Sequence, residues 1–249
     1  KGTQKHPTGE FDKILESKGA INNAATSKDY THYFITIPSK DFELALEMHA
    51  DMLQNPAIPP DGLERERKVV IEEISKDISA PSQILYNNLI EMMYTQHPYK
   101  RKVIGTEKII QNIPREKIYD YFYKYYAPSN MITVIVGDIN TENALKIINK
   151  NFEQNYRKIP KHNYYKEKPL DAQVEKTDYT QTESGYMLIG FRTVNAKDKD
   201  VYTLDLLSTI LGDGKSSILY KNLKEKKELA FSISASNSTY KDDGMFFRL

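Results

Sequence analysis

The chain has 249 residues, of which 39% are hydrophobic and 28% charged, as in a folded globular protein. The formal net charge of +1 gives no sign of nucleic-acid binding, and no apolar run is long enough to cross a membrane. The absence of cysteine excludes thiol catalysis and cysteine-bound zinc within this sequence. It leaves the compartment open between the bacterial cytoplasm, the periplasm and an organelle.

Helix and strand patterns alternate along the first part of the chain. An amphipathic helix is predicted at 10–18, with Gly19 to end it, and a strand rich in β-branched residues at 31–37. The apolar run 131–137 predicts a buried central strand, and the helix after it is expected to begin with Thr141 as its cap. Further helices are predicted at 40–54, 63–77, 81–93, 115–125 and 141–152.

A change of composition divides the chain. Residues 153–176 carry several lysines and two prolines without an apolar period, which indicates a linker. The patterns then begin again, with strands predicted at 185–191, 231–240 and 245–249 and helices at 201–211 and 216–226. The chain therefore predicts an α+β fold of two related α/β halves, each a mainly antiparallel sheet packed with helices. We expect the remainder of a first domain at 1–155, a linker at 156–176 and an incomplete second domain at 177–249.

Two carboxylates on one predicted helix, Glu66 and Glu73, are seven residues apart. At 3.6 residues per turn they lie on nearly the same face, two turns from each other. One interpretation is a solvent-facing helix in which Arg65, Arg67 and Lys68 supply the opposite charges, and the helix alone favours it. The other interpretation is a metal ligand with a second carboxylate behind it.

A series of ordered motifs resembles the pitrilysin/insulinase-type zinc peptidases, in the branch close to mitochondrial processing peptidase. The motifs are Lys1-Gly2-Thr3, Ile21–Thr31, the helix with Glu66 and Glu73, His97–Thr106, Tyr125–Asn130 and Gly137-Asp138. The resemblance covers the whole chain. It implies a zinc-dependent metalloendopeptidase, or its metal-bearing subunit, that hydrolyses extended peptides.

Members of that family carry an inverted zinc motif, H-x-x-E-H, in which two histidines bind zinc and the glutamate activates water. The resemblance implies that Glu73 is the third zinc ligand and that Glu66 is the carboxylate that orients the ligands. The motif is expected just before Lys1, so the fragment alone is expected to be inactive. The histidines of the chain include no two that are three or four residues apart on a helix; they are His6, His32, His49, His97 and His162.

The resemblance also places an edge strand at Asn22–Ser27, to which an extended substrate adds by backbone pairing. It makes Asn23, Ala24, Ala25 and Thr26 the expected substrate-binding residues. Without the resemblance, the same segment is interpreted as a plain connection between a helix and a strand.

One pair of positions departs from the family pattern. Many members carry an Arg and a Tyr seven residues apart in the second half, and these bind the substrate carbonyl. Here Lys224 keeps the charge without the planar guanidinium, and Phe231 has no hydroxyl. Another subunit is therefore expected to supply the pair, in the manner of the two-subunit members of the family. The expected assembly is a homo- or heterodimer with a related subunit.

Three interpretations stay open at this point. Glu66 and Glu73 favour a zinc peptidase, whereas Lys224 and Phe231 favour a non-catalytic family member that serves as a structural or substrate-binding subunit. A plain α+β binding domain would leave unexplained that Asn23 and Ala24 occur together with Glu66 and Glu73 in one chain. The expected cofactor is zinc and the expected partner is a peptide substrate, with no nucleic acid and no transmembrane segment.

Overall fold

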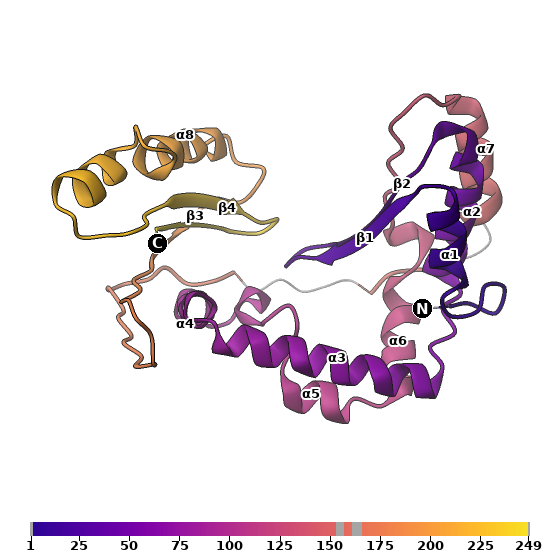
Figure 1. Ribbon diagram of the computed structural model, residues 1–249, viewed down its shortest axis with the longest axis horizontal. Helices are drawn as coiled ribbons and strands as arrows, with labels where there is room; N and C mark the ends of the chain where they lie inside the picture. The colour runs from indigo at the N-terminus through magenta and orange to yellow at the C-terminus, as the bar shows by residue number, and fades with distance from the viewer. Residues whose placement is uncertain (1, 153–156, 161–165, 249) are drawn as a thin grey trace. The chain divides into compact units, whose positions relative to one another are not determined.

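The computed structural model describes residues 2–152, 157–160 and 166–248 and shows an α+β chain with small antiparallel sheets (Figure 1). Its residues group into two compact units, each built from three stretches of sequence. The first unit comprises 1–26, 31–72 and 106–163, and the second comprises 27–30, 73–105 and 164–249. Part of the linker expected at 156–176, namely residues 156 and 161–165, lies outside the described residues.

In the first unit a β-hairpin lies beside three helices (Figure 1). α1 buries Phe11 and Leu15, and Gly19 after it adopts φ 72°, the left-handed conformation that commonly ends helices. These two side chains form a core cluster with Ala45 and Met48 of α2, and α7 packs on α2. The elements are α1 (Glu10–Ser17), β1 (Ile21–Thr26), β2 (Thr31–Thr36), α2 (Phe42–Gln54) and α7 (Thr141–Phe152).

A long helix, α3 (Pro60–Ser79), begins at a proline. Proline is favourable there because the N–H groups of the first turn have no acceptor within the helix, so its lack of an N–H costs no hydrogen bond. Arg67 on α3 donates hydrogen bonds to the carbonyl oxygens of Ile110, in α5 (Glu107–Asn112), and of Ile113, which follows α5 and precedes α6 (Arg115–Tyr125). The sequence patterns did not predict α5. It has only six residues and buries none of them, so it carries no apolar stripe.

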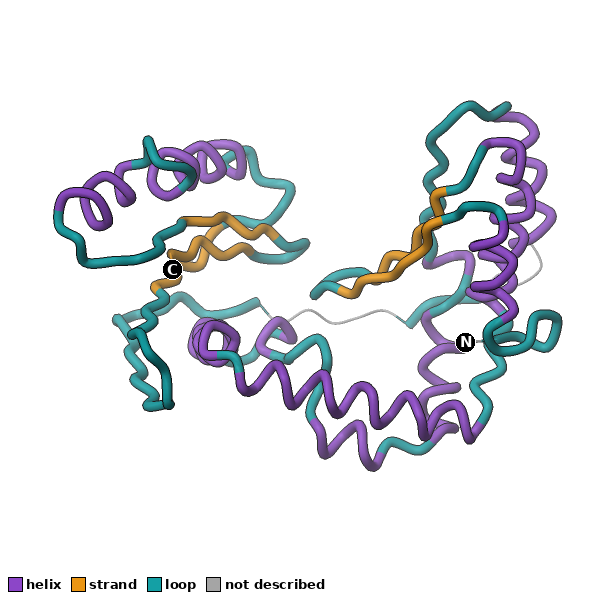
Figure 2. The backbone as a smooth tube through the Cα atoms, in the orientation of Figure 1, coloured by secondary structure: helices purple, strands orange, loops and turns teal. Residues whose placement is uncertain are grey.

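The second unit contains a three-stranded antiparallel sheet in the order β3-β5-β4, drawn in orange in Figure 2. α8 lies against β4. A core cluster consists of Leu89, Ile90, Met93, Tyr94, Tyr99 and Met245. The elements are α4 (Pro81–Met93), β3 (Ile189–Thr193), α8 (Val201–Gly212), a π-helical segment (Tyr220–Lys226), β4 (Ala235–Thr239) and β5 (Gly244–Arg248). None of the described helices combines the length and apolarity needed to cross a membrane.

The prediction of a central strand at 131–137 is wrong for the described part of the chain. No described residue pairs with this run, and Ile132, Val134 and Val136 are 93%, 77% and 92% exposed. A strand exists only through its neighbour, because the ladder hydrogen bonds are made between strands and not within one strand. An apolar sequence therefore predicts the capacity to pair but not the presence of a partner.

Smaller differences concern the ends of elements. α7 is capped by Asn140, whose Oδ1 accepts from the backbone N–H of Asn143 (2.9 Å), and not by Thr141 as expected. β3 begins at Ile189 and β4 at Ala235, four residues later in each case than the sequence patterns indicate. The helix expected at 216–226 is present in part, as the π-helical segment.

Candidate functional site

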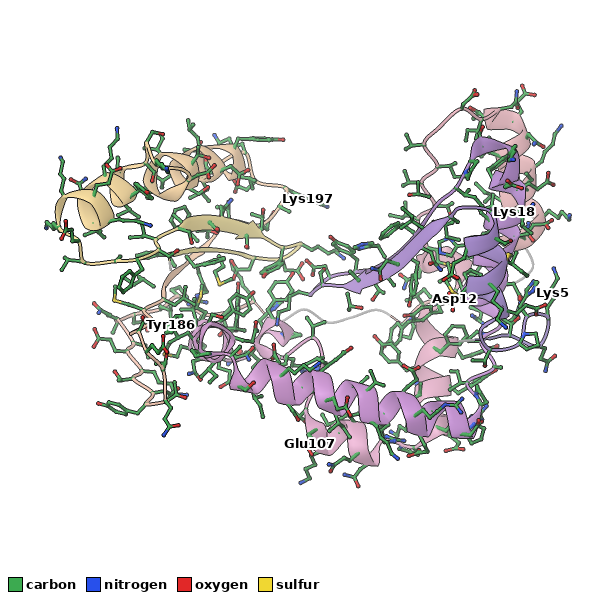
Figure 3. The ribbon with its side chains drawn as sticks, in the orientation of Figure 1. Lys5, Asp12, Lys18, Glu107, Tyr186 and Lys197 are labelled. Carbon is green, nitrogen blue, oxygen red and sulfur yellow. The ribbon has the colours of Figure 1, made fainter. Side chains whose placement is uncertain are left out.

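The four residues expected to bind substrate, Asn23, Ala24, Ala25 and Thr26, all lie on β1 and are exposed. The interpretation of this segment as a plain connection is therefore wrong. β1 follows α1 directly, and Asn22 Nδ2 contacts Asp12 Oδ1 of α1 (3.4 Å; Asp12 is labelled in Figure 3). Among the described residues β1 pairs only with β2, so it has one open edge.

The turn fixes which backbone groups face this open edge. The N–H of Ser27 donates to the carbonyl of Tyr30 (2.8 Å), so these two residues form a hydrogen-bonded pair. Hydrogen-bonded and non-hydrogen-bonded pairs alternate along an antiparallel ladder. The backbone groups of Asn22, Ala24 and Thr26 therefore point away from β2. One of them is already engaged, because the Ala24 N–H donates to Oδ1 of Asn23 (2.8 Å).

The two carboxylates on α3 differ in their surroundings. Glu73 is exposed and makes no hydrogen bond or ion pair with a described residue, whereas Glu66 is half-buried. The arginines of the helix bind other acids, since Arg65 pairs with Asp61 (3.5 Å) and Arg67 with Glu64 (3.2 Å). The exposure of Glu73 and these two ion pairs agree with the solvent-facing interpretation, although neither arginine pairs with Glu73 itself.

One carboxylate is a suitable ligand for zinc but cannot hold the ion by itself, because zinc sites in proteins use three or four ligands. The part of the chain that the structure describes contains no group of three or more His, Cys, Asp or Glu side chains that could hold a metal ion. Glu73 fits the expected zinc site as one ligand among several. The remaining ligands have to come from outside the described residues.

The structure brings the two departing positions of the second half together. Nζ of Lys224 donates to the backbone carbonyl of Phe231 (2.5 Å) and lies 5.2 Å from the ring centre of Tyr220. The chain bends between them at Glu228, which has a positive φ of 53°. The Phe231 side chain is 87% exposed. Lys224 thus satisfies a carbonyl of its own chain, and Phe231 presents only an apolar ring.

Sequence patterns gave no role to Glu167. In the structure its carboxylate binds three consecutive residues, Thr95, Gln96 and His97. Its carboxylate accepts hydrogen bonds from Oγ1 and N–H of Thr95 (2.6 and 3.0 Å) and from the N–H groups of Gln96 (2.9 Å) and His97 (2.7 Å). Partial burial by itself would raise the pKa of Glu167, but these bonds outweigh it and lower the pKa to about 2. No local pattern in the sequence signals this role, since the partners are 70 to 72 residues away.

Comparison with known proteins finds two family models that together cover most of the chain. Residues 1–107 match the model described as insulinase (peptidase family M16), and residues 112–247 match the model described as the peptidase M16 inactive domain. The chain is 33% identical over 252 residues to the zinc protease PqqE of Helicobacter pylori, covering 99% of this chain and 56% of that protein.

Solved structures agree with this similarity. A protease from Helicobacter pylori matches with a TM-score of 0.88 and 32% identity, over 100% of this chain and 61% of that one. A mutant of the ferredoxin protease FusC, solved in complex with Arabidopsis ferredoxin, has the same fold with a TM-score of 0.70 at 22% identity, over 100% of this chain and 29% of that one. The chain thus spans well under two thirds of the length of each of these relatives.

Proposed function

Because the chain belongs to the insulinase family of peptidases, M16, we propose that its full-length protein is a zinc-dependent metalloendopeptidase or the metal-bearing subunit of one. In this proposal the chain contributes a zinc ligand, Glu73, and a strand that pairs with substrate, β1. In this proposal the H-x-x-E-H motif precedes Lys1 in the full-length protein. The chain by itself then hydrolyses no peptide.

The open edge of β1 is the observation that carries the proposal. Its outward backbone groups at Asn22, Ala24 and Thr26 can form an antiparallel or parallel ladder with an extended peptide, which is a recurring mode of peptide binding. The methyl side chain of Ala24 leaves room for a second backbone. Asn23 has to release the Ala24 N–H when a substrate carbonyl takes its place. A polypeptide substrate also agrees with the ferredoxin bound to FusC.

Zinc, when bound, supplies a water molecule whose pKa is lowered towards neutrality. Glu73 suits the role of ligand because its carboxylate is exposed and no described residue competes for it. Glu66, two helical turns earlier on α3, orients the ligand set and balances its charge.

A second candidate function is a non-catalytic subunit that binds peptides or stabilises a catalytic partner. The contact of Lys224 with the carbonyl of Phe231 favours it, because neither residue can then stabilise an oxyanion. The two candidates meet in a heterodimer in which a related but different subunit supplies the missing Arg and Tyr. A homodimer could not do so, because its second copy carries the same Lys224 and Phe231.

The test uses the full-length protein, with zinc content and cleavage of an unstructured fluorogenic peptide as readouts. Glu73→Gln should remove zinc and abolish cleavage, and Glu66→Gln should reduce metal affinity or activity by about 10- to 100-fold. Glu72→Gln is the matched control, since Glu72 is exposed and adjacent on the same helix. A wild-type protein that binds no zinc and cleaves nothing would refute the peptidase and leave the non-catalytic subunit. Normal zinc content in Glu73→Gln would refute its role as a ligand.

A further inference from the structure

The turn between β1 and β2 has an unusual composition. It consists of Lys28 and Asp29 between the paired residues Ser27 and Tyr30. Two-residue hairpin turns favour Gly, Asn or Asp in conformations with positive φ, because only these match the twist of the strands. Neither Lys28 nor Asp29 has a positive φ. Locally, the Asp29 N–H donates only a long hydrogen bond to Oγ of Ser27 (3.4 Å), and contacts from elsewhere in the chain add to this weak support.

Those contacts come from two segments of the second unit, to which the turn itself belongs. The Asp29 carboxylate accepts the Tyr99 hydroxyl on Oδ1 (2.7 Å) and the backbone N–H of Lys241 on Oδ2 (2.7 Å). Nζ of Lys28 donates to the backbone carbonyls of Tyr99 (2.7 Å) and Arg101. Both side chains of the turn are thus held by groups that are 70 or more residues away in sequence.

The Tyr99 end of this anchor is rigid. Its side chain is 3% exposed, and its ring centre lies 4.1 Å from that of His97, 5.0 Å from Tyr240 and 5.6 Å from Tyr94. Its hydroxyl also accepts the backbone N–H of Asp242 (3.1 Å). Burial, and then the hydrogen bond to Asp29, raise the pKa of the phenol, so it stays a donor at neutral pH.

We propose that Asp29 and Lys28 are positioning residues that hold the β1–β2 turn, and with it the conformation of β1, ready to pair with an extended peptide. The proposal deepens the function above and rests on it. A hairpin of two short strands is marginal in water, so an exposed edge strand needs such support to keep one conformation before its partner arrives. Preorganisation of this kind reduces the entropy lost on binding.

Hydrogen exchange in the full-length protein tests the anchor independently of catalysis. Asp29→Asn keeps the size of the side chain but leaves only one acceptor oxygen, and Tyr99→Phe removes the hydroxyl. Both variants should accelerate amide exchange in the peptide that covers 21–36 by about tenfold, which corresponds to about 1.4 kcal/mol. Tyr86→Phe is the matched control, because the Tyr86 hydroxyl contacts Tyr240 (3.3 Å) and not the turn. Unchanged exchange in Asp29→Asn and Tyr99→Phe would overturn the anchor.

Peptide binding then tests the positioning role. In Asp29→Asn, KM for a long unstructured peptide should rise about tenfold with kcat nearly unchanged, while the melting temperature stays close to that of Tyr86→Phe. Asp29→Glu, which restores both acceptors, should recover part of the affinity. Faster exchange with an unchanged KM would overturn the positioning role. A wild-type protein that cleaves no peptide would instead refute the proposed enzyme, and the dissociation constant of a labelled peptide would then replace KM in the same comparison.

Discussion

Replacement of Glu167 by glutamine should lower the free energy of unfolding by about 2 kcal/mol at neutral pH. The carboxylate accepts two hydrogen bonds on each oxygen, from Thr95 on one and from the N–H groups of Gln96 and His97 on the other. Glutamine keeps one acceptor oxygen and turns an NH₂ group towards two N–H donors, so it loses one pair of bonds. A hydrogen bond to a charged group contributes about 1.5–3 kcal/mol, and partial exposure to water places the loss for the pair near the lower end.

The effect should depend on pH in a defined direction. The pKa of Glu167 is held at about 2, below its ordinary value of 4.5. A carboxyl whose pKa is lower in the folded state contributes its full stability above the ordinary pKa and loses it as the pH falls towards the folded value. The difference between the wild type and Glu167→Gln should therefore be constant from pH 7 to about 5 and shrink below that.

Thermal unfolding of the full-length protein between pH 7 and pH 3 measures both effects. A loss of 2 kcal/mol corresponds to about 4–8 °C in the melting temperature for a domain of this size. Glu183→Gln is the control, because Glu183 is exposed and makes no such bonds. An unchanged melting temperature in Glu167→Gln at pH 7, or a difference that is as large at pH 3 as at pH 7, would refute the reasoning.

Two further predictions concern stability. Arg115→Lys should lower the free energy of unfolding in urea by about 1–2 kcal/mol, because the guanidinium donates to the carbonyls of Ile58 (2.6 Å) and Ala57 (3.1 Å) and an ammonium lacks this planar geometry. Lys117→Arg, on the exposed side of α6, is the control, and equal urea midpoints for the two variants would contradict the prediction. Gly212→Ala should separate α8 from β4 and lower the melting temperature, since a Cβ there would come 2.2 Å from the backbone N of Ala235. Gly185→Ala is the control and should have little effect, because Gly185 has open space around it. Similar melting temperatures for the two variants would show that α8 packs differently.

The helices were the part of the fold that the sequence could predict. α4 and α6 begin and end at the predicted residues, and α1 differs by one. Each helix forms hydrogen bonds within its own segment, so an apolar stripe, a starting proline or a terminal glycine is enough to locate it. Strands depend on a partner, and this is why the run 131–137 was predicted as a strand and is unpaired.

The residues of the candidate site were predicted from the family resemblance and not from local sequence patterns. Periodicity alone placed Glu66 and Glu73 on one face of a helix but favoured a solvent-facing helix over a metal site. Without the resemblance, the segment of Asn23 was interpreted as a plain connection. The anchors that the structure reveals join residues far apart in sequence, as Asp29 with Lys241 at a separation of 212 residues. No local pattern encodes such a pair, because the sequence around Asp29 carries no information about a partner 212 residues away.

The order of strands in the second unit has a consequence for folding during synthesis on the ribosome. β5 is the central strand, and β3 pairs with it but not with β4. β5 follows β3 by some 50 residues in the sequence, so β3 leaves the exit tunnel before its only described partner does. The local β4–β5 hairpin can close first, and β3 has to wait for it with its backbone hydrogen-bonding groups unpaired. Chaperone binding during synthesis should therefore concentrate on the stretch from β3 to α8, and slow codons placed there would lengthen the exposed interval.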